Sequence, residues 1–190
     1  VQIVFDNKVI LGTRARKTRT KSFNAFSSID YPETAMFRDR RLIQFLQRPA
    51  DYTHAVFSTA LDPNVFVLRL VPGMRADIIP LLEGRYRALV LESFGVGGLP
   101  GGDDGAMFAA VRDWCGAGHL AVFTTQVPHE GSDLAVYEVG RAAKALPGVL
   151  EAHDMTPEAT AVKLMWVLGQ TTDRAEAEKL FLTPVQWDIL

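Results

Sequence analysis

This chain of 190 residues contains a single cysteine, Cys115. An internal disulfide is therefore impossible, and the class of small secreted scaffolds held by disulfides is excluded. Trp114 precedes Cys115 and small residues follow it, which is typical of a helix end that packs inward. A catalytic thiol needs exposure and a lowered pKa, so we expect a buried, inert cysteine here.

Long apolar runs and an excess of one charge are also missing. No run approaches the ~20 residues that span a bilayer, so we expect no membrane association. The formal net charge of −2 indicates no basic footprint for nucleic acid. The first residues, Val1 to Phe5, lack the charged region and long apolar stretch of a secretory signal. Their pattern is typical of a strand, and no initiator Met precedes them. These features predict a cytoplasmic protein from which a preceding segment is absent.

Residues that commonly hold metals or cofactors are sparse and scattered. The four histidines lie far apart, without a spacing such as His-Glu-x-x-His. The turn Gly95-Val96-Gly97 falls short of a dinucleotide fingerprint, and no acidic residue is placed to hold a ribose. We therefore expect no metal and no cofactor.

Two segments of different character follow one another along the chain. In the first, Gln2–Phe5 and Lys8–Leu11 alternate around Asp6-Asn7 and predict a β-hairpin. Poor periodicity and three prolines then predict a linker over 29–64, with a short helix around Arg40 to Gln47. The hairpin and the basic run that follows it would thus occupy 1–28.

From residue 65 onward, buried strands alternate with helices. The strands expected are Val65–Val71, Ala88–Leu91 and Leu120–Phe123; the helices expected are Arg75–Glu83, Ala106–Cys115, Val136–Leu146, Pro157–Gly169 and Arg174–Phe181. Alternation of this kind implies βαβ units with right-handed crossovers. The sequence therefore predicts an α/β domain over 65–190, a small parallel sheet flanked by helices.

Three stretches of the chain resemble the type I, cytoplasmic L-asparaginase family, in the family's order. They are Gly12 to Thr20 with Ala25-Phe26-Ser27-Ser28, the loop Ser93 to Gly98, and Asp154-Met155-Thr156-Pro157-Glu158 with Lys163-Leu164. The resemblance implies the carboxy-terminal portion of an enzyme that converts L-asparagine and water to L-aspartate and ammonia. It assigns residues 1–28 to the terminal strands of that enzyme's larger amino-terminal domain, and 65–190 to its carboxy-terminal domain. It also implies a homo-oligomer with sites near subunit contacts.

The family's two catalytic threonine stretches, Thr-Gly-Gly-Thr and Thr-Asp-Thr, do not occur in this sequence. The resemblance assigns the catalytic lysine to Lys17. A lysine accepts a proton from a hydroxyl nucleophile only when burial or positive charge lowers its pKa. The run Arg14, Arg16, Lys17, Arg19 and Lys21 by itself favours a solvated basic strand, and the residues around it favour the catalytic assignment. We expect this chain to be inactive unless an amino-terminal asparaginase domain or a complementing chain supplies the nucleophile.

The loop that carries Ser93, Gly97 and Gly98 is a candidate substrate-binding element, because it follows the carboxyl end of an expected parallel strand. The glycines could equally serve a plain strand-to-helix turn. The resemblance implies a contact with a neighbouring subunit's substrate site, where the family commonly has asparagine in place of Gly98. Two other functions stay open: a non-catalytic binding domain derived from an asparaginase, and an amidase subunit that acts on another amide.

Overall fold

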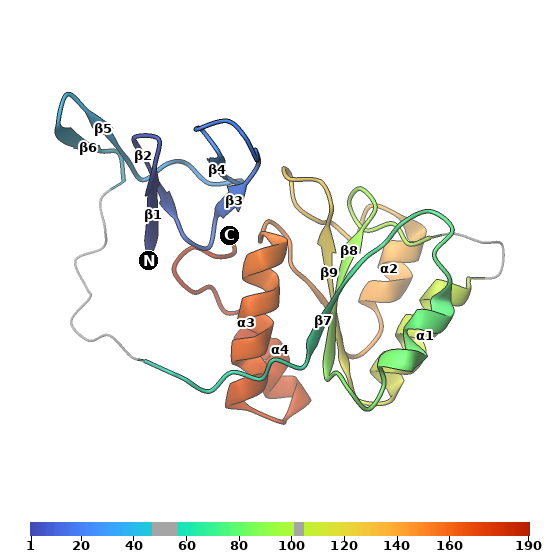
Figure 1. The fold of residues 1–190 in the computed structure, drawn as a ribbon. Helices are drawn as coiled ribbons and strands as arrows, with labels where there is room; N and C mark the ends of the chain where they lie inside the picture. Colours follow the sequence, from blue (N-terminus) through green and yellow to red (C-terminus); the bar gives the residue numbers. More distant parts are fainter. Residues whose placement is uncertain (47–56, 101–104) are drawn as a thin grey trace. The chain divides into compact units, whose positions relative to one another are not determined.

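The computed structural model describes residues 1–46, 57–100 and 105–190 (Figure 1). Two compact units divide the chain, Val1–Ala60 and Leu61–Leu190. Among the described residues, the first unit has antiparallel strands and the second has a parallel sheet between helices, so the mixed α/β fold that the sequence predicts is confirmed. No helix of the described residues is both long and apolar enough to cross a membrane.

The first unit is built from hairpins. One sheet has the strand order β1-β2-β5-β6, and β3 pairs with β4 in a separate two-stranded sheet. The strands are β1 Gln2–Phe5, β2 Lys8–Leu11, β3 Ala15–Lys17, β4 Phe26–Ser28, β5 Ala35–Arg38 and β6 Arg41–Gln44. The predicted first hairpin is confirmed, and its turn residues Asp6 and Asn7 take positive φ angles of 48° and 60°. Asp and Asn tolerate this left-handed backbone better than other non-glycine residues do.

A second hairpin replaces the helix expected around Arg40 to Gln47, so that prediction is wrong for residues 40–46; Gln47 lies outside the described residues. Asp39 and Arg40 form the turn with φ of 49° and 62°, and β6 pairs antiparallel with β5. The four residues of β6 are all exposed, so their hydrophobic pattern carried no sign of a buried face. Pairing with β5 decides the structure of this segment. The two strands lie inside the range 29–64 that we predicted as a linker.

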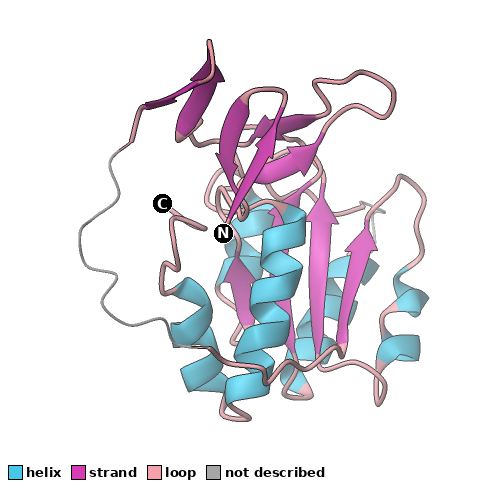
Figure 2. Ribbon diagram, turned by 60° about the vertical axis from the view of Figure 1, so that its left-hand side comes forward, coloured by secondary structure: helices cyan, strands magenta, loops and turns pink. Residues whose placement is uncertain are grey.

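The second unit has a four-stranded parallel sheet in the order β10-β9-β8-β7. The strands are β7 Val65–Arg69, β8 Ala88–Ser93, β9 Leu120–Thr125 and β10 Val149–Glu151; the helices are α1 Ala106–Gly116, α2 Glu138–Lys144, α3 Pro157–Gln170 and α4 Arg174–Leu182. Figure 2 shows this sheet between its helices. The three expected strands and four of the five expected helices are confirmed, with β10 as an addition.

The fifth expected helix, Arg75–Glu83, is instead two 3₁₀ turns, Ala76–Ile78 and Pro80–Leu82. Pro80 has no amide hydrogen to donate and its ring obstructs the preceding helical turn, so it strongly disfavours a continuous α-helix over this segment. The apolar spacing of this segment favoured a helix, and the proline outweighs that spacing.

Each face of the parallel sheet carries its own core, because side chains alternate between faces along a strand. Val90 and Val122 lie in one cluster with Leu164 and Phe181 of α3 and α4. Leu89, Leu91, Ala121 and Phe123 lie in the other with Val111 and Trp114 of α1, and Ala143 of α2. Figure 1 shows α1 and α2 on one side of the sheet and α3 and α4 on the other. This three-layer arrangement fixes the loops at the carboxyl ends of the strands.

Candidate functional site

Lys17 is the last residue of β3, where it pairs with Phe26 of β4. Its side chain is exposed and has no hydrogen bond or ion pair with the described residues. Arg14, three residues earlier, is fully buried and its guanidinium lies 5.5 Å from the centre of the Tyr31 ring. The basic run is therefore divided between a buried arginine and exposed charges, of which Lys17 is one.

Ser93 ends β8, and its hydroxyl is already engaged. The residue is fully buried, and Oγ donates a hydrogen bond of 2.7 Å to the carbonyl oxygen of Thr124 on β9. This bond ties the ends of two neighbouring strands together at the start of the candidate loop. The hydrogen bond thus fixes Ser93, the first residue of the loop.

The loop closes on itself immediately after Ser93. Phe94 and Gly98 exchange backbone hydrogen bonds, from Phe94 N to Gly98 O at 2.9 Å and from Gly98 N to Phe94 O at 2.7 Å. Gly95 takes a φ of 52°, and Gly97 takes a φ of 154°. These two positions explain why the loop is rich in glycine.

Thr125, the last residue of β9, and Gln126, which follows it, bind this loop and the strand ends next to it. The hydroxyl of Thr125 donates to Gly95 O and accepts from Val127 N at 3.0 Å. The side-chain amide of Gln126 donates to Leu70 O at 2.6 Å and to Glu92 O at 2.8 Å. Gln126 therefore joins the carboxyl ends of β7 and β8. Thr125 and Gln126 belong to no motif that would select them, because their neighbours differ from the family's catalytic threonine stretch. Their place beside the loop was therefore missed.

A buried carboxylate lies at the end of β10. Glu151 has a side chain that is 4% exposed, and its Oε1 accepts from Leu134 N at 2.7 Å. Its Oε2 lies 3.1 Å from Lys144 Nζ and 3.9 Å from His153 Nδ1. A glutamate after two apolar residues in a three-residue strand gave no sequence signal. Among the described residues, no group of three or more His, Cys, Asp or Glu is arranged to hold a metal ion.

The signature from Asp154 to Lys163 performs structural tasks within the second unit. Thr156 is the N-cap of α3, and its side chain accepts from Ala159 N at 3.1 Å. Asp154 Oδ1 accepts from Leu190 N at 3.1 Å, and Lys163 pairs with Asp188 at 2.8 Å. These contacts fix the start of α3 and the segment after α4.

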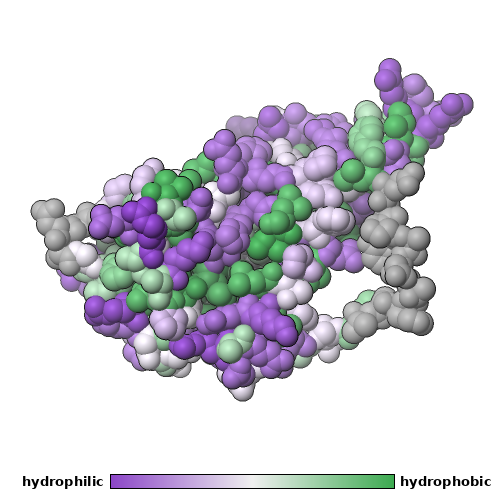
Figure 3. Space-filling model, turned by 180° about the vertical axis from the view of Figure 1, so that it is seen from behind, coloured by the Kyte–Doolittle hydropathy of each residue, from purple (hydrophilic) through white to green (hydrophobic). Residues whose placement is uncertain are grey.

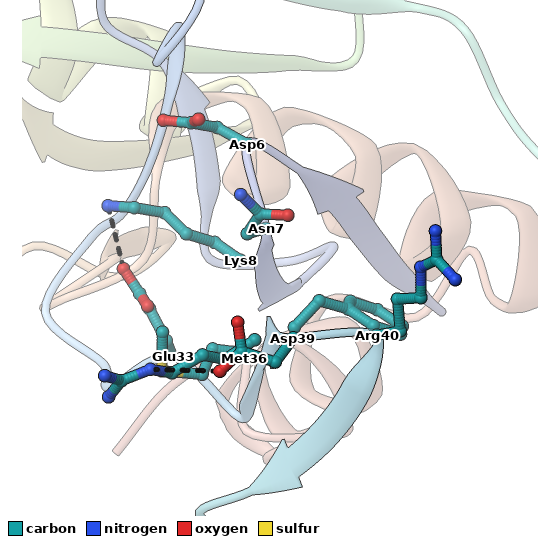
Figure 4. Close-up of a pocket in the computed structure, with 9 residues that line it drawn as sticks. Asp6, Asn7, Lys8, Glu33, Met36, Asp39 and Arg40 are labelled. Carbon is teal, nitrogen blue, oxygen red and sulfur yellow. Dashed lines mark ion pairs between the residues drawn. The ribbon is translucent and has the colours of Figure 1, made fainter.

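An open hollow of about 790 Å³ in the first unit lies between the turns of the two hairpins (Figure 4). Its charged side chains come from both turns, and Lys8 pairs with Glu33 at 2.9 Å. None of the predicted site residues, Lys17 included, lines it. We therefore assign the hollow no role.

Family models match the chain in two consecutive stretches. The model described as "Asparaginase, N-terminal" matches residues 1–50, and the "Glutaminase/Asparaginase C-terminal domain" matches residues 64–181. The second match alone covers more than half of the chain.

Individual relatives agree with these models. The L-asparaginase of Thermococcus kodakarensis is 38% identical over 181 residues, which are 95% of this chain and 54% of that protein. A glutamyl-tRNA(Gln) amidotransferase subunit of Metallosphaera sedula is 34% identical over 178 residues, which are 90% of this chain and 39% of that relative. The solved structure of the thermostable L-asparaginase from T. kodakarensis superposes with a TM-score of 0.92 at 35% identity, covering 100% of this chain and 57% of that one. The chain thus spans about half, or less, of the length of the relatives it matches.

Proposed function

The chain belongs to the glutaminase/asparaginase family, and from this membership we propose that it forms the carboxy-terminal part of a type I, cytoplasmic L-asparaginase. The reaction would convert L-asparagine and water to L-aspartate and ammonia. The observation that carries the proposal is the match of both family models in order, over 1–50 and 64–181, with the lysine motif on β3 inside the first match.

Lys17 is the residue we propose to act in catalysis. An alcohol is a weak nucleophile at its own pKa, so a threonine that attacks an amide carbon needs a group to take its proton. The side chain of Lys17 is exposed and has no partner among the described residues, so the segment that supplies the threonine can cover it. Burial by that segment favours the neutral amine, which is the form that accepts a proton. The chain's own sequence has no Thr-Gly-Gly-Thr or Thr-Asp-Thr stretch, and the nucleophile must come from an amino-terminal asparaginase segment or a complementing chain.

The Ser93 to Gly98 loop is proposed to contribute to the substrate site of a neighbouring copy. It follows the carboxyl end of β8, and Gly95 at its tip is exposed.

Val127, Val136 and Tyr137 follow β9 and expose 47%, 51% and 56% of their surface. Figure 3 shows apolar patches among polar side chains on the face that it draws. Apolar surface of this kind supports self-association, so we propose a homo-oligomer.

A second candidate is an amidase subunit that acts on an amide carried by tRNA. Relatives named as glutamyl-tRNA(Gln) amidotransferase subunits match 90% of the chain. The small net charge hides an uneven distribution, since residues 1–60 contain 10 of the 20 basic residues but only 5 of the 22 acidic ones. A basic segment of this kind suits a phosphate backbone. The alternative of a non-catalytic domain derived from the family has no specific observation in its favour.

Ammonia release distinguishes these functions. The chain would be mixed with the amino-terminal part of a related asparaginase and supplied with L-asparagine or with L-glutamine. Release from asparagine supports the asparaginase proposal. Release that requires glutamine and is stimulated by glutamyl-tRNA supports the amidotransferase alternative. No release from either substrate, with both segments folded and associated, would refute both enzymes.

A further inference from the structure

The segment 131–134, which precedes α2, supports the Ser93 to Gly98 loop from one side. Asp133 N donates a hydrogen bond of 2.8 Å to Val96 O, in the middle of the loop. The side chain of Leu134, only 1% exposed, packs on Gly97 so closely that a Cβ at position 97 would lie 2.6 Å from Leu134 Cδ2. We call residues 131–134 the buttress.

The buttress is itself held by tight backbone contacts. A Cβ added to Gly140 of α2 would lie 2.5 Å from Leu134 O, and one added to Gly131 would lie 2.5 Å from His153 O. Ser132 N donates to the same His153 carbonyl at 2.9 Å. Backbone segments that approach too closely for a Cβ to fit leave the buttress little room to shift without moving α2 or the end of β10.

Glu151 provides the polar anchor in this packing. Its Oε1 accepts the amide hydrogen of Leu134, the residue whose side chain contacts Gly97. Its Oε2 is held by Lys144 of α2 at 3.1 Å. The carboxylate therefore links β10, α2 and the buttress in one place. A hydrogen bond between an ionised carboxylate and a buried amide is among the stronger ones in proteins.

We propose that Glu151 is a positioning residue for the Ser93 to Gly98 loop, acting through Leu134 and the buttress. The inference rests on the proposed function only where it connects the loop to a substrate site. The hydrogen bond from Leu134 fixes the backbone of the buttress, Asp133 then fixes Val96, and the Leu134 side chain fixes Gly97. The carboxylate itself touches no substrate.

Amide hydrogen exchange of the chain alone tests the positioning directly. Glu151→Met removes the acceptor at similar length, whereas Glu151→Gln keeps a carbonyl oxygen for Leu134 N. We expect exchange of the amides of residues 96–98 and 134 to rise about tenfold in Glu151→Met and to stay close to wild type in Glu151→Gln. Glu178→Gln, which removes the carboxylate paired with Arg174 on α4, is the matched control and should change none of these amides. A rise that is equal at all amides of the second unit, or absent from the loop, would overturn the proposal.

Leu134→Val provides an independent variant in case Glu151→Met does not fold. It keeps the backbone amide that donates to Glu151 and removes the Cδ2 atom that packs on Gly97, so it should loosen the same amides while Glu151 remains in place. If Leu134→Val leaves the loop as protected as in wild type, the Leu134 side chain does not hold it and the proposal fails.

Kinetics in the complemented enzyme then connect the loop to substrate. Glu151→Met should raise KM for asparagine about tenfold while kcat changes less than about twofold, and Glu151→Gln should restore KM. A loosened loop with unchanged KM would overturn its link to the substrate site. An inactive wild-type mixture would count against the proposed function, and hydrogen exchange would still decide whether Glu151 positions the loop.

Discussion

Lys163 Nζ and Asp188 Oδ2 lie 2.8 Å apart in the second unit, and their side chains are only 5% and 4% exposed. The same ammonium donates to Thr183 O at 2.8 Å, and Asp188 Oδ1 accepts from Val185 N at 2.7 Å. This pair ties the middle of α3 to the segment that follows α4. It gives a structural purpose to the lysine of the Asp154 to Lys163 signature.

Removal of one partner should be costly. Lys163→Met leaves the Asp188 carboxylate buried without its counter-charge, and we expect it to lower the free energy of unfolding by about 3–5 kcal/mol. Urea denaturation followed by circular dichroism measures the change. Adding Asp188→Asn to Lys163→Met removes the stranded charge, keeps an acceptor for Val185 N and should recover part of the loss. A cost below about 1 kcal/mol for Lys163→Met alone would show that the pair is not buried as described.

Thr156 should stabilise the start of α3. Its side chain accepts a hydrogen bond from Ala159 N, and Pro157 follows at the first helical position. Thr156→Ala should cost about 1 kcal/mol of unfolding free energy, and Thr156→Ser should cost much less because the hydroxyl remains. Equal denaturation midpoints for Thr156→Ala and wild type would mean that the cap contributes nothing.

Cys115 should be inert in the folded chain. Burial raises the pKa of the thiol to about 11, against a smaller opposing effect of the Arg174 charge. The thiolate fraction at pH 8 should therefore be about a hundredfold smaller than in the unfolded chain, and alkylation should be slowed at least as much. Because the folded state favours the neutral thiol, the contribution of Cys115 to the free energy of unfolding is fully present below the pKa of the unfolded thiol. It is lost as the pH rises through about 11. Rapid native-state labelling by a thiol reagent at pH 8 would contradict this assignment.

Asp62 should contribute to the acid limb of stability. Burial alone would raise the pKa of this carboxyl, but the hydrogen bond from Asn64 N and the charge of Arg87 at 2.8 Å together lower it. Stability from this group is present above the unfolded value of about 3.9 and is lost as the pH falls through the lowered folded value. Wild type should therefore lose more stability than Asp62→Asn when the pH falls from about 5 to 3. Asp77→Asn, which removes the carboxylate of an exposed ion pair with Arg75, is the control and should lose as much stability as wild type over this range, because exposed ion pairs contribute little.

The sequence predicted those elements whose hydrophobic pattern and local chemistry agree. Continuous apolar runs marked β7, β8 and β9, and the start of α3 was marked by Thr156 and Pro157. The Asp6-Asn7 turn marked the first hairpin, since both residue types accept positive φ. In these places one residue or one short run is sufficient evidence.

Prediction failed where pairing with another strand, near or distant in sequence, decides the structure. β6 forms because β5 pairs with it, and the Asp39-Arg40 turn contains no glycine that would have indicated a hairpin. β10 is three residues long, and its pairing with β9 at Val149 to Glu151 could not be read from so short a run. Sequence pattern describes one segment at a time, whereas these strands depend on two.

The candidate site shows the same division. The glycine-rich sequence predicted a candidate binding loop at Gly97 and Gly98, but it did not indicate that Leu134 packs on Gly97. Glu151 and Gln126 are ordinary polar residues in sequence, and only the fold places them beside the loop, as an anchor and as a link between strand ends. Lys17 was identified through its motif, and its role in catalysis remains a prediction.

Ammonia release from L-asparagine, by this chain alone and mixed with the amino-terminal part of a related asparaginase, tests the proposed catalytic role of Lys17 most directly. We predict no release by the chain alone, release by the mixture, and a loss of at least about a hundredfold when Lys17→Met replaces the wild-type chain in that mixture. Arg19→Met, at another exposed cation next to β3, should retain most of the activity. Turnover by the isolated chain would contradict the proposal that another segment supplies the nucleophile, and a Lys17→Met mixture as active as wild type would contradict the proposed function of Lys17.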